Sequence, residues 1–420
     1  MARFFAPEYV GLLSLANAVS VLVFTALDAG TSQLFVREYR PDLGYPTSMK
    51  RQVARRYVLG LIGLGATIGS CSFLTDSLRS GLLVASAVGG GYALDFMVQM
   101  WLAPDRMLLN NVPDTVAKLM QGGLALITIT VLAATSADLA TLSITIVASY
   151  VAAAWSPWRR WRARVVFTDL LVGPSQASRR VVISAGILIT IYTRIDTLAV
   201  QIVTGAAGVA IYSVSFKLIE SARLPGWALG RTALAQASGG DVLPSGRLIG
   251  GFFLGCGLAS FVFCGGPWLQ EAVYGSEYGG SVPSAVIRLL TPSIVTASLT
   301  APLSAMYLGA GDELQVMRAA ALTTAVTVVS LAVLVPLHGL VGAAGAALAG
   351  ETTSAYVYLR SWRRQNGALS LALPEALCIF IACCCCAGAL AAPAGGTTIG
   401  LGTVAALPLL TCAARRFAWL

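Results

Sequence analysis

The feature that most constrains this chain is a series of apolar runs, each about 20 residues long, that recur along almost its whole length. The chain is 56% hydrophobic and 11% charged, whereas a soluble domain is about 25% charged. Backbone groups inside a bilayer must be satisfied within the protein, which restricts membrane-spanning segments to helices or closed barrels. Because the runs lack strand-like alternation, we predict an all-α polytopic membrane protein without a separate soluble domain.

Thirteen spans are predicted, with ends uncertain by a few residues. A basic connector with an aromatic belt, residues 159–180, is interpreted as the link between two helical lobes. The predicted spans are roughly 10–36, 53–74, 81–102, 113–134, 138–158, 180–203, 208–236, 247–270, 282–309, 314–336, 339–359, 375–391 and 397–414.

Lysine and arginine gather in alternate connectors, at residues 37–56, 159–180 and 360–374 and at the C-terminal end. Basic connectors stay on the cytoplasmic side of a membrane, so we expect a cytoplasmic C-terminus. The net charge of +9 therefore reflects membrane topology and does not indicate nucleic-acid binding. An odd number of spans would place the N-terminus outside, and we expect that a first helix is missing from the chain as written.

The segment 192–226 is apolar enough to enter a bilayer and yet carries five ionisable side chains. A break at residues 204–208 divides it into two antiparallel helices, which we interpret as one wall of a transport cavity. Ionisable groups at membrane depth cost about 2.5–3.5 kcal/mol each on insertion scales and usually face a protein interior or a wet cavity. The five side chains are Arg194, Asp196, Lys217, Glu220 and Arg223.

Helical geometry extends this interpretation. Arg194 and Gln201 share a polar stripe with several threonines, at about 100° per residue. Folding the hairpin near residue 206 would bring Asp196 level with Lys217, so we expect these two to neutralise each other while Arg194 faces the cavity. The alternative is that all five charges form a structural network without a ligand.

Two further spans carry polar stripes. Asn17 and Asp28 lie on one face of the first span, and Asp95 shares a face of the third span with Tyr92 and Gln99. An acidic side chain inside a membrane can be a proton or cation site or a structural hydrogen-bond acceptor, and both interpretations stay open for Asp28 and Asp95.

No cofactor, metal or catalytic group is predicted. The consecutive cysteines at 383–386 point around a helix and cannot converge on one ion. No external connector exceeds about a dozen residues or holds a cluster of acid, base and metal-ligand groups, which argues against a membrane enzyme. Small-residue spacings predict close helix contacts, at Gly65/Gly69, Gly251/Gly255 and Gly342/Ala346/Gly350.

Four stretches carry a family resemblance, in order, between residue 2 and about residue 360. ARFFAPEYVGLLSLANAV with LDAGTSQLFVRE, TRIDTLAVQIVTGAAGVAIYSVSFKLIESARLPG, YGSEYGGSVPSAVIRLL and VPLHGLVGAAGAALAGE resemble segments of polysaccharide flippases. These form the polysaccharide-transport branch of the multidrug/oligosaccharidyl-lipid/polysaccharide exporter (MOP) superfamily.

The resemblance implies two pseudo-symmetric bundles of six helices around a central cavity, followed by two further helices. The expected parts are an N-terminal lobe (1–158) lacking the family's first helix, a basic cytoplasmic linker (159–180), a C-terminal lobe (181–360) and two additional helices (361–420). It implies alternating access that moves an undecaprenyl-diphosphate-linked oligosaccharide across the bacterial cytoplasmic membrane for surface polysaccharide synthesis, including lipopolysaccharide and exopolysaccharide.

The expected partners are the lipid-linked oligosaccharide, membrane lipids and the polysaccharide polymerase with other assembly proteins. Arginine suits a diphosphate because its forked donors match phosphate oxygens. The predicted substrate-binding residues are Arg194, Lys217, Arg223, Gln201 and Asn17, and the predicted coupling or structural network is Asp28, Asp95, Asp196, Glu220 and Glu351.

Three alternatives stay open. A drug or cation antiporter of the same superfamily would rely on Asp28 and Asp95 more than on Arg194. A membrane enzyme, such as an oligosaccharide polymerase, would need a longer catalytic loop. A non-transporting homologue descended from a flippase is consistent with a missing first helix.

Overall fold

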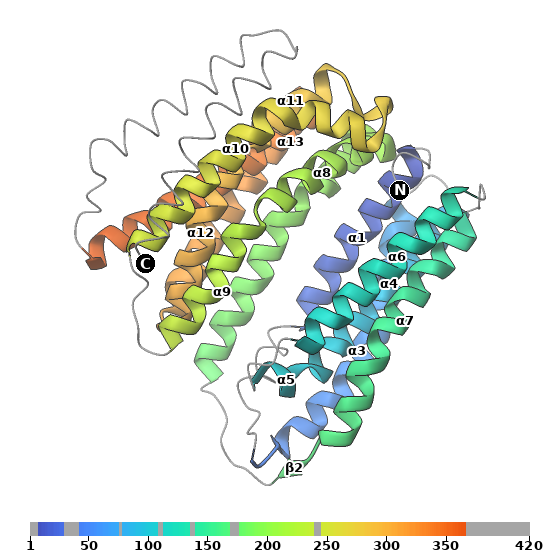
Figure 1. The fold of residues 1–420 in the computed structure, drawn as a ribbon, viewed down its shortest axis with the longest axis vertical. Coiled ribbons are helices and arrows are strands. Elements are labelled where there is room, and N and C mark those ends of the chain that lie inside the picture. The colour runs from blue at the N-terminus through green and yellow to red at the C-terminus, as the bar shows by residue number, and fades with distance from the viewer. Residues whose placement is uncertain are drawn as a thin grey trace. The chain divides into compact units, whose positions relative to one another are not determined.

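A computed structural model shows a protein built almost entirely of long helices (Figure 1). The chain forms two compact units, residues 1–210 and 211–420, which are considered separately below. The structure describes residues 7–28, 42–74, 78–107, 112–134, 139–168, 176–238 and 245–366.

The first unit is a helical bundle in which α4 is central, since it packs against α1, α3 and α7, and α6 packs on α7. A short helix, α5, follows α4 directly and contacts it. The helices are α1 (Pro7–Asp28), α3 (Ser48–Leu74), α4 (Leu78–Trp101), α5 (Ala103–Met107), α6 (Val112–Ala134) and α7 (Leu139–Arg164).

A two-residue parallel sheet ties two basic connectors together. Strand β1 (Tyr45–Pro46) pairs with β2 (Phe167–Thr168), and Tyr45 donates its backbone N–H to the carbonyl of Val166 at 2.9 Å. The buried Tyr45 ring packs against Trp161, with ring centroids 5.4 Å apart. The pairing shows that the connectors at 37–56 and 159–180 meet at one end of the unit, as the charge pattern predicted; the side of the membrane stays a prediction.

Helix α8 (Gln176–Ala222) begins in the first unit and ends in the second. Its backbone breaks at Gly205, where φ is +70° and ψ is −172°. Positive φ is a conformation that glycine adopts readily and that side chains with a Cβ disfavour. The predicted break at 204–208 is therefore confirmed, and glycine is the physical reason for its position.

The second unit is also helical, with α12 packed against α9, α10 and α13. Its helices after α8 are α9 (Leu224–Ser238), α10 (Ser245–Tyr274), α11 (Ser281–Leu290), α12 (Pro292–Gly309) and α13 (Glu313–Asn366), with a short 3-10 turn η1 (Ser276–Tyr278) between α10 and α11.

Helix α13 folds back on itself as a hairpin. Its backbone breaks at Gly339, where φ is +54° and ψ is −126°. A Cβ on Gly342 would lie 2.0 Å from the carbonyl oxygen of Leu334, and one on Gly350 would lie 2.1 Å from Oγ1 of Thr327. Because the residue numbers rise on one arm as they fall on the other, the two arms run antiparallel in close contact.

Helices cover the predicted spans that fall on the described residues, and the prediction of an all-α polytopic membrane protein is confirmed. In this part of the chain, 7 helices are long and apolar enough to cross a bilayer, and two of them contain the breaks at Gly205 and Gly339. The predicted spans at 375–391 and 397–414 lie outside the described residues. The predicted linker between two lobes at 159–180 stays a prediction, and the two compact units meet within α8, between residues 210 and 211.

The small-residue predictions had mixed outcomes. Gly251 and Gly255 lie at helix contacts, because added Cβ atoms would meet Leu229 at 2.7 Å and Oγ of Ser298 at 2.5 Å. The spacing at Gly65 and Gly69 was wrong as a contact, since added Cβ atoms there would meet nothing within 4 Å in the described structure.

Candidate functional site

The strongest candidate site in the second unit centres on Arg223, between α8 and α9. Pro225 has no N–H to continue the helical ladder, and the chain turns at Arg223 between the two helices. The predicted single span at 208–236 therefore consists of two helical segments, and a cationic side chain lies at their junction.

The Arg223 side chain is buried next to one carboxylate and one aromatic ring. The side chain is 7% exposed, and its Nη1 lies 3.2 Å from Oε1 of Glu351 on α13. Its guanidinium carbon lies 5.6 Å from the ring centroid of Phe216. The Nε atom is buried and has no hydrogen-bond partner in the described part of the chain. Arg223 thus has a carboxylate partner at Nη1, while its Nε donor has no hydrogen-bond partner among the described residues.

Lys217 forms a second, more exposed ion pair on α8. Its ammonium nitrogen lies 2.6 Å from Oε2 of Glu220, and the Lys217 side chain is 55% exposed. Residues three apart on a helix are neighbours, so the pair follows from sequence spacing alone. A pair this exposed contributes little to stability, which leaves Lys217 available to exchange partners.

A polar network that sequence reasoning missed lies nearby in the second unit. The buried amide of Gln270 on α10 accepts a hydrogen bond from the hydroxyl of Ser215 at 3.0 Å and donates to the backbone carbonyl of Tyr278 at 3.0 Å. The sequence contained a signal for this network, because Gln270 lies in the apolar stretch of α10 and a buried amide requires hydrogen-bond partners. This network links α8, α10 and the η1 turn.

The first unit holds a comparable site around Asp28, the last residue of α1. Oδ1 of Asp28 lies 2.7 Å from Nη2 of Arg56 on α3, whose side chain is 2% exposed. Nε of Arg56 donates to the carbonyl of Phe96 on α4 at 2.8 Å, and its guanidinium carbon lies 3.9 Å from the Phe96 ring centroid. Three helices therefore converge on one arginine.

The sequence analysis counted Arg56 among the basic residues of the connector at 37–56, although it also falls in the predicted span at 53–74. The structure places it in α3, which begins at Ser48. The signal that could have found it is the face it shares with Gly60 and Gly63. Added Cβ atoms on those glycines would meet Met97 and Phe24 side chains at 2.7 Å. A face lined by glycines packs closely, so an arginine on it must point into the bundle.

The two predicted polar stripes of the first unit meet each other. The hydroxyl of Tyr92 on α4 donates to Oδ1 of Asn17 on α1 at 2.7 Å. Asp95, one turn further along α4, accepts from the amide of Gln99 at 3.1 Å and 3.2 Å. Asn17, a predicted substrate-binding residue, and Asp95, a predicted coupling or structural residue, thus both have protein partners.

Asp95 also borders a small cavity between α4, α6 and α7. Its other polar lining includes Lys118, Gln121 and Tyr150. The cavity volume is about 10 Å³, which is about one water-sized sphere. It can hold a water molecule but no organic cation.

The first arm of α8 carries the remaining predicted residues. Arg194 is half-buried, while the buried Asp196 accepts from the backbone N–H of Thr197 at 2.7 Å. The Gln201 side chain donates to the carbonyl of Leu74, the last residue of α3, at 3.1 Å. Gln201 therefore satisfies a carbonyl at a helix end, which is a structural use of a predicted ligand-binding residue.

The threonines of the predicted stripe are also engaged locally. Thr190, Thr193 and Thr204 each donate to a carbonyl one turn earlier in α8, at 3.0, 2.9 and 2.8 Å. Because their hydroxyl hydrogens are used, their oxygens can only accept further hydrogen bonds. The predicted pairing of Asp196 with Lys217 joins the two units and stays a prediction.

This arrangement of helices is the fold of MOP-superfamily transporters. The solved structures that share it include a multidrug resistance transporter of the MATE family in an inward-facing conformation, with a TM-score of 0.58 and 14% identity over 87% of this chain and 91% of that one. No family model and no curated protein matches the sequence.

Two other solved structures extend the comparison. The lipid II flippase MurJ in an inward closed conformation has a TM-score of 0.65 and 12% identity over 99% of this chain and 98% of that chain. A MOP-superfamily transporter from Pyrococcus furiosus has a TM-score of 0.59 and 14% identity over 86% of each chain. The TM-scores establish the shared fold, and identities this low leave the substrate open.

Proposed function

We propose that this protein is an alternating-access flippase that moves a lipid-diphosphate-linked oligosaccharide across the bacterial cytoplasmic membrane during surface polysaccharide synthesis. The observation that carries the proposal is Arg223, a buried cation with an Nε donor that has no partner among the described residues. A diphosphate supplies acceptor oxygens for such donors, and charge-assisted hydrogen bonds of this kind are strong.

The contact with Glu351 provides a way to load and release an anion. At 3.2 Å, this ion pair is longer than the 2.7 Å pair formed by Arg56. A diphosphate that approaches Arg223 would compete with the carboxylate, and Glu351 would recover the guanidinium when the lipid leaves. Lys217, already exposed and paired with Glu220, is the second cation proposed to meet the headgroup, with Arg194 as a third.

The sugar chain requires many weak polar contacts and no single strong one. Threonine oxygens along the first arm of α8 can accept hydrogen bonds from sugar hydroxyls, because their own hydrogens are already donated. The likeness to a solved lipid II flippase supports a lipid-linked substrate. The identity of the sugar, the coupling ion and a link to a polymerase are left open by this proposal.

A drug or cation antiporter is the second candidate, favoured by the multidrug transporters among the proteins of the same fold. It would use Asp28 and Asp95 to bind a cation. Asp28 is already paired with Arg56, and the cavity beside Asp95 has a volume of only about 10 Å³. A proton or a small ion fits these acids better than a drug does.

Complementation tests the proposal. A bacterial strain that lacks its own polysaccharide flippase would receive this chain, Arg223→Gln or the control Arg247→Gln, and surface polysaccharide would be measured at matched protein levels. Arg247 is a half-buried arginine in the first turn of α10. We expect rescue by the wild-type chain and the control, and loss of rescue with Arg223→Gln.

Export of a cationic dye that is unaffected by Arg223→Gln, without any polysaccharide rescue by the wild-type chain, would favour the antiporter instead. A well-folded wild-type chain that supports neither activity would indicate a non-transporting homologue.

A further inference from the structure

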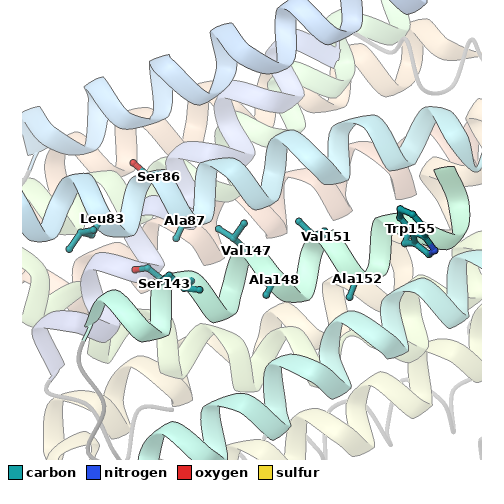
Figure 2. A pocket seen from close by; sticks show the side chains of 10 residues that line it. Leu83, Ser86, Ala87, Ser143, Val147, Ala148, Val151, Ala152 and Trp155 are labelled. Atoms are coloured by element: carbon teal, nitrogen blue, oxygen red, sulfur yellow. The ribbon is translucent and has the colours of Figure 1, made fainter. Parts of the chain in front are cut away.

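An apolar groove runs along the surface of the first unit between α4 and α7. Its volume is about 730 Å³. Ala148 and Val151 line its α7 side, and Ala87 lines its α4 side (Figure 2). The α4 side of the groove is formed by Leu83, Ser86 and Ala87, and its α7 side runs from Ser143 to Trp155.

The ends of the groove differ in chemistry. Ser86 and Ser143 lie toward one end, and Trp155 lies at the other (Figure 2). From Ser143 to Trp155 the groove is about 18 Å long at the rise of a helix, which is close to half of the roughly 30 Å hydrocarbon core of a bilayer. The groove therefore has the length of one acyl chain in one leaflet.

Beyond Trp155, the same face of α7 becomes cationic. Arg159 and Arg162 follow Trp155 by one and two helical turns, and both are exposed. The Trp155 and Trp158 rings lie 5.4 Å apart, and the Arg162 guanidinium carbon lies 5.6 Å from the Trp158 ring. Along this face the side chains are first apolar, then aromatic and then positively charged. The acyl tail, the glycerol region and an anionic headgroup of a phospholipid follow in the same order.

The two other arginines at this helix end are used within the protein. Arg160 donates to the hydroxyl of Ser156 at 2.7 Å, and Arg164 lies 2.7 Å from the buried Asp105 on α5. Arg159 and Arg162 are both exposed, so their guanidinium groups are accessible to an anionic headgroup. Trp155 supports this, since tryptophan favours the boundary between acyl chains and headgroups.

We propose that the α4–α7 groove, Trp155, Arg159 and Arg162 form a binding site for a net anionic phospholipid of the cytoplasmic leaflet. One acyl chain lies in the groove, the indole of Trp155 lies at the glycerol level, and the two arginines contact the phosphate headgroup. This lipid is distinct from the transported substrate, and the proposal does not depend on the proposed flippase activity.

Native mass spectrometry of the purified full-length protein tests the site. The protein would be titrated with phosphatidylglycerol or with phosphatidylethanolamine carrying the same acyl chains. We expect a preference for phosphatidylglycerol. The double variant Arg159→Gln with Arg162→Gln should weaken its binding roughly 30-fold, at about 1 kcal/mol for each juxtamembrane basic residue.

Two controls test whether the effects are specific to this site, one for the loss of positive charge and one for the addition of a bulky side chain. Arg360→Gln with Arg364→Gln removes the same charge from exposed positions near the end of α13 and should leave binding within about twofold, because no groove residue is involved. Ala148→Trp fills the groove from an exposed position, whereas Leu61→Trp adds the same ring to a side chain that is 72% exposed on α3.

Ala148→Trp should reduce phosphatidylglycerol binding at least about tenfold, and Leu61→Trp should not. If Ala148→Trp does not yield folded protein, Val151→Asn tests the same wall and should also weaken binding. Equal affinity for the two lipids, equal losses in the α13 control, or unchanged binding after the groove changes would overturn the proposal. A protein dimer that Ala148→Trp dissociates would also overturn it.

Discussion

Each unit buries an arginine against a carboxylate and a phenylalanine ring, but the two arginines are held differently. Arg56 in the first unit has a 2.7 Å carboxylate contact, a backbone carbonyl at 2.8 Å and a ring at 3.9 Å. Arg223 in the second unit has a 3.2 Å carboxylate contact and a ring at 5.6 Å. The short contacts of Arg56 with α1 and α4 favour a structural role, whereas the longer contacts of Arg223 with Glu351 and Phe216 are those that the proposed ligand role requires.

The largest expected effect is on stability, from Arg56→Ala. Removal of one partner of a buried ion pair costs about 3–5 kcal/mol, because the remaining charge is left uncompensated. Thermal unfolding of the detergent-purified protein should show a strong decrease in midpoint. Arg55→Ala changes the exposed neighbouring arginine and should leave the midpoint nearly unchanged. Equal decreases for both variants would contradict the structural role of Arg56.

The second prediction compares the two ion pairs by replacing both members of each pair with leucine. Asp28→Leu combined with Arg56→Leu should recover most of the stability lost with Arg56→Ala, since apolar replacement of a whole buried pair is often close to neutral. Glu351→Leu with Arg223→Leu should likewise fold, but should abolish polysaccharide rescue in the complementation strain. Retained rescue by the second double variant would remove Arg223 from the proposed transport mechanism.

The third prediction compares packing in the two units through matched glycines. Gly342→Ala places a Cβ 2.0 Å from the carbonyl of Leu334 in the α13 hairpin, whereas a Cβ at Gly65 meets nothing within 4 Å. Overpacking costs about 1–3 kcal/mol, so Gly342→Ala should lower the unfolding midpoint. Gly65→Ala should be neutral or slightly stabilising, because alanine favours helix by about 1 kcal/mol over glycine. A lower unfolding midpoint for Gly65→Ala than for Gly342→Ala would contradict the packing described at these two glycines.

The smallest expected effect comes from Tyr92→Phe, which removes the 2.7 Å hydrogen bond to Asn17. The loss of one such bond costs about 1 kcal/mol, measured as a small decrease in the unfolding midpoint. Tyr57→Phe, at an exposed position of α3, provides the control. Polysaccharide rescue should persist with Tyr92→Phe, and a complete loss would place Asn17 and Tyr92 in substrate binding.

The helices could be predicted from the sequence because membrane depth imposes one solution on any long apolar run. The breaks at Gly205 and Gly339 were also within reach, since glycine adopts positive φ more readily than other residues and both lie between predicted apolar spans. The start of α3 was less accessible. Arginines at residues 55 and 56 look alike in sequence, and only the glycines further along the helix distinguish the buried side chain from the exposed one.

The candidate site could be predicted only in part. The Lys217–Glu220 pair could have been predicted from helical spacing, although the sequence analysis paired Lys217 with Asp196. Arg223 and Glu351 are far apart in sequence and meet through tertiary packing. Gln201 shows the limit of a stripe argument, because a polar face can serve a neighbouring helix end as well as a ligand. Spacing on one helix says which side chains share a face, but not what that face contacts.

The turn at Gly339 also bears on how the protein enters the membrane. Gly342 already touches Leu334, so the chain reverses with almost no residues to spare for a water-exposed loop. Both arms are therefore expected to enter the bilayer together as a helical hairpin, and a reporter domain inserted between them is expected to disrupt the insertion of both.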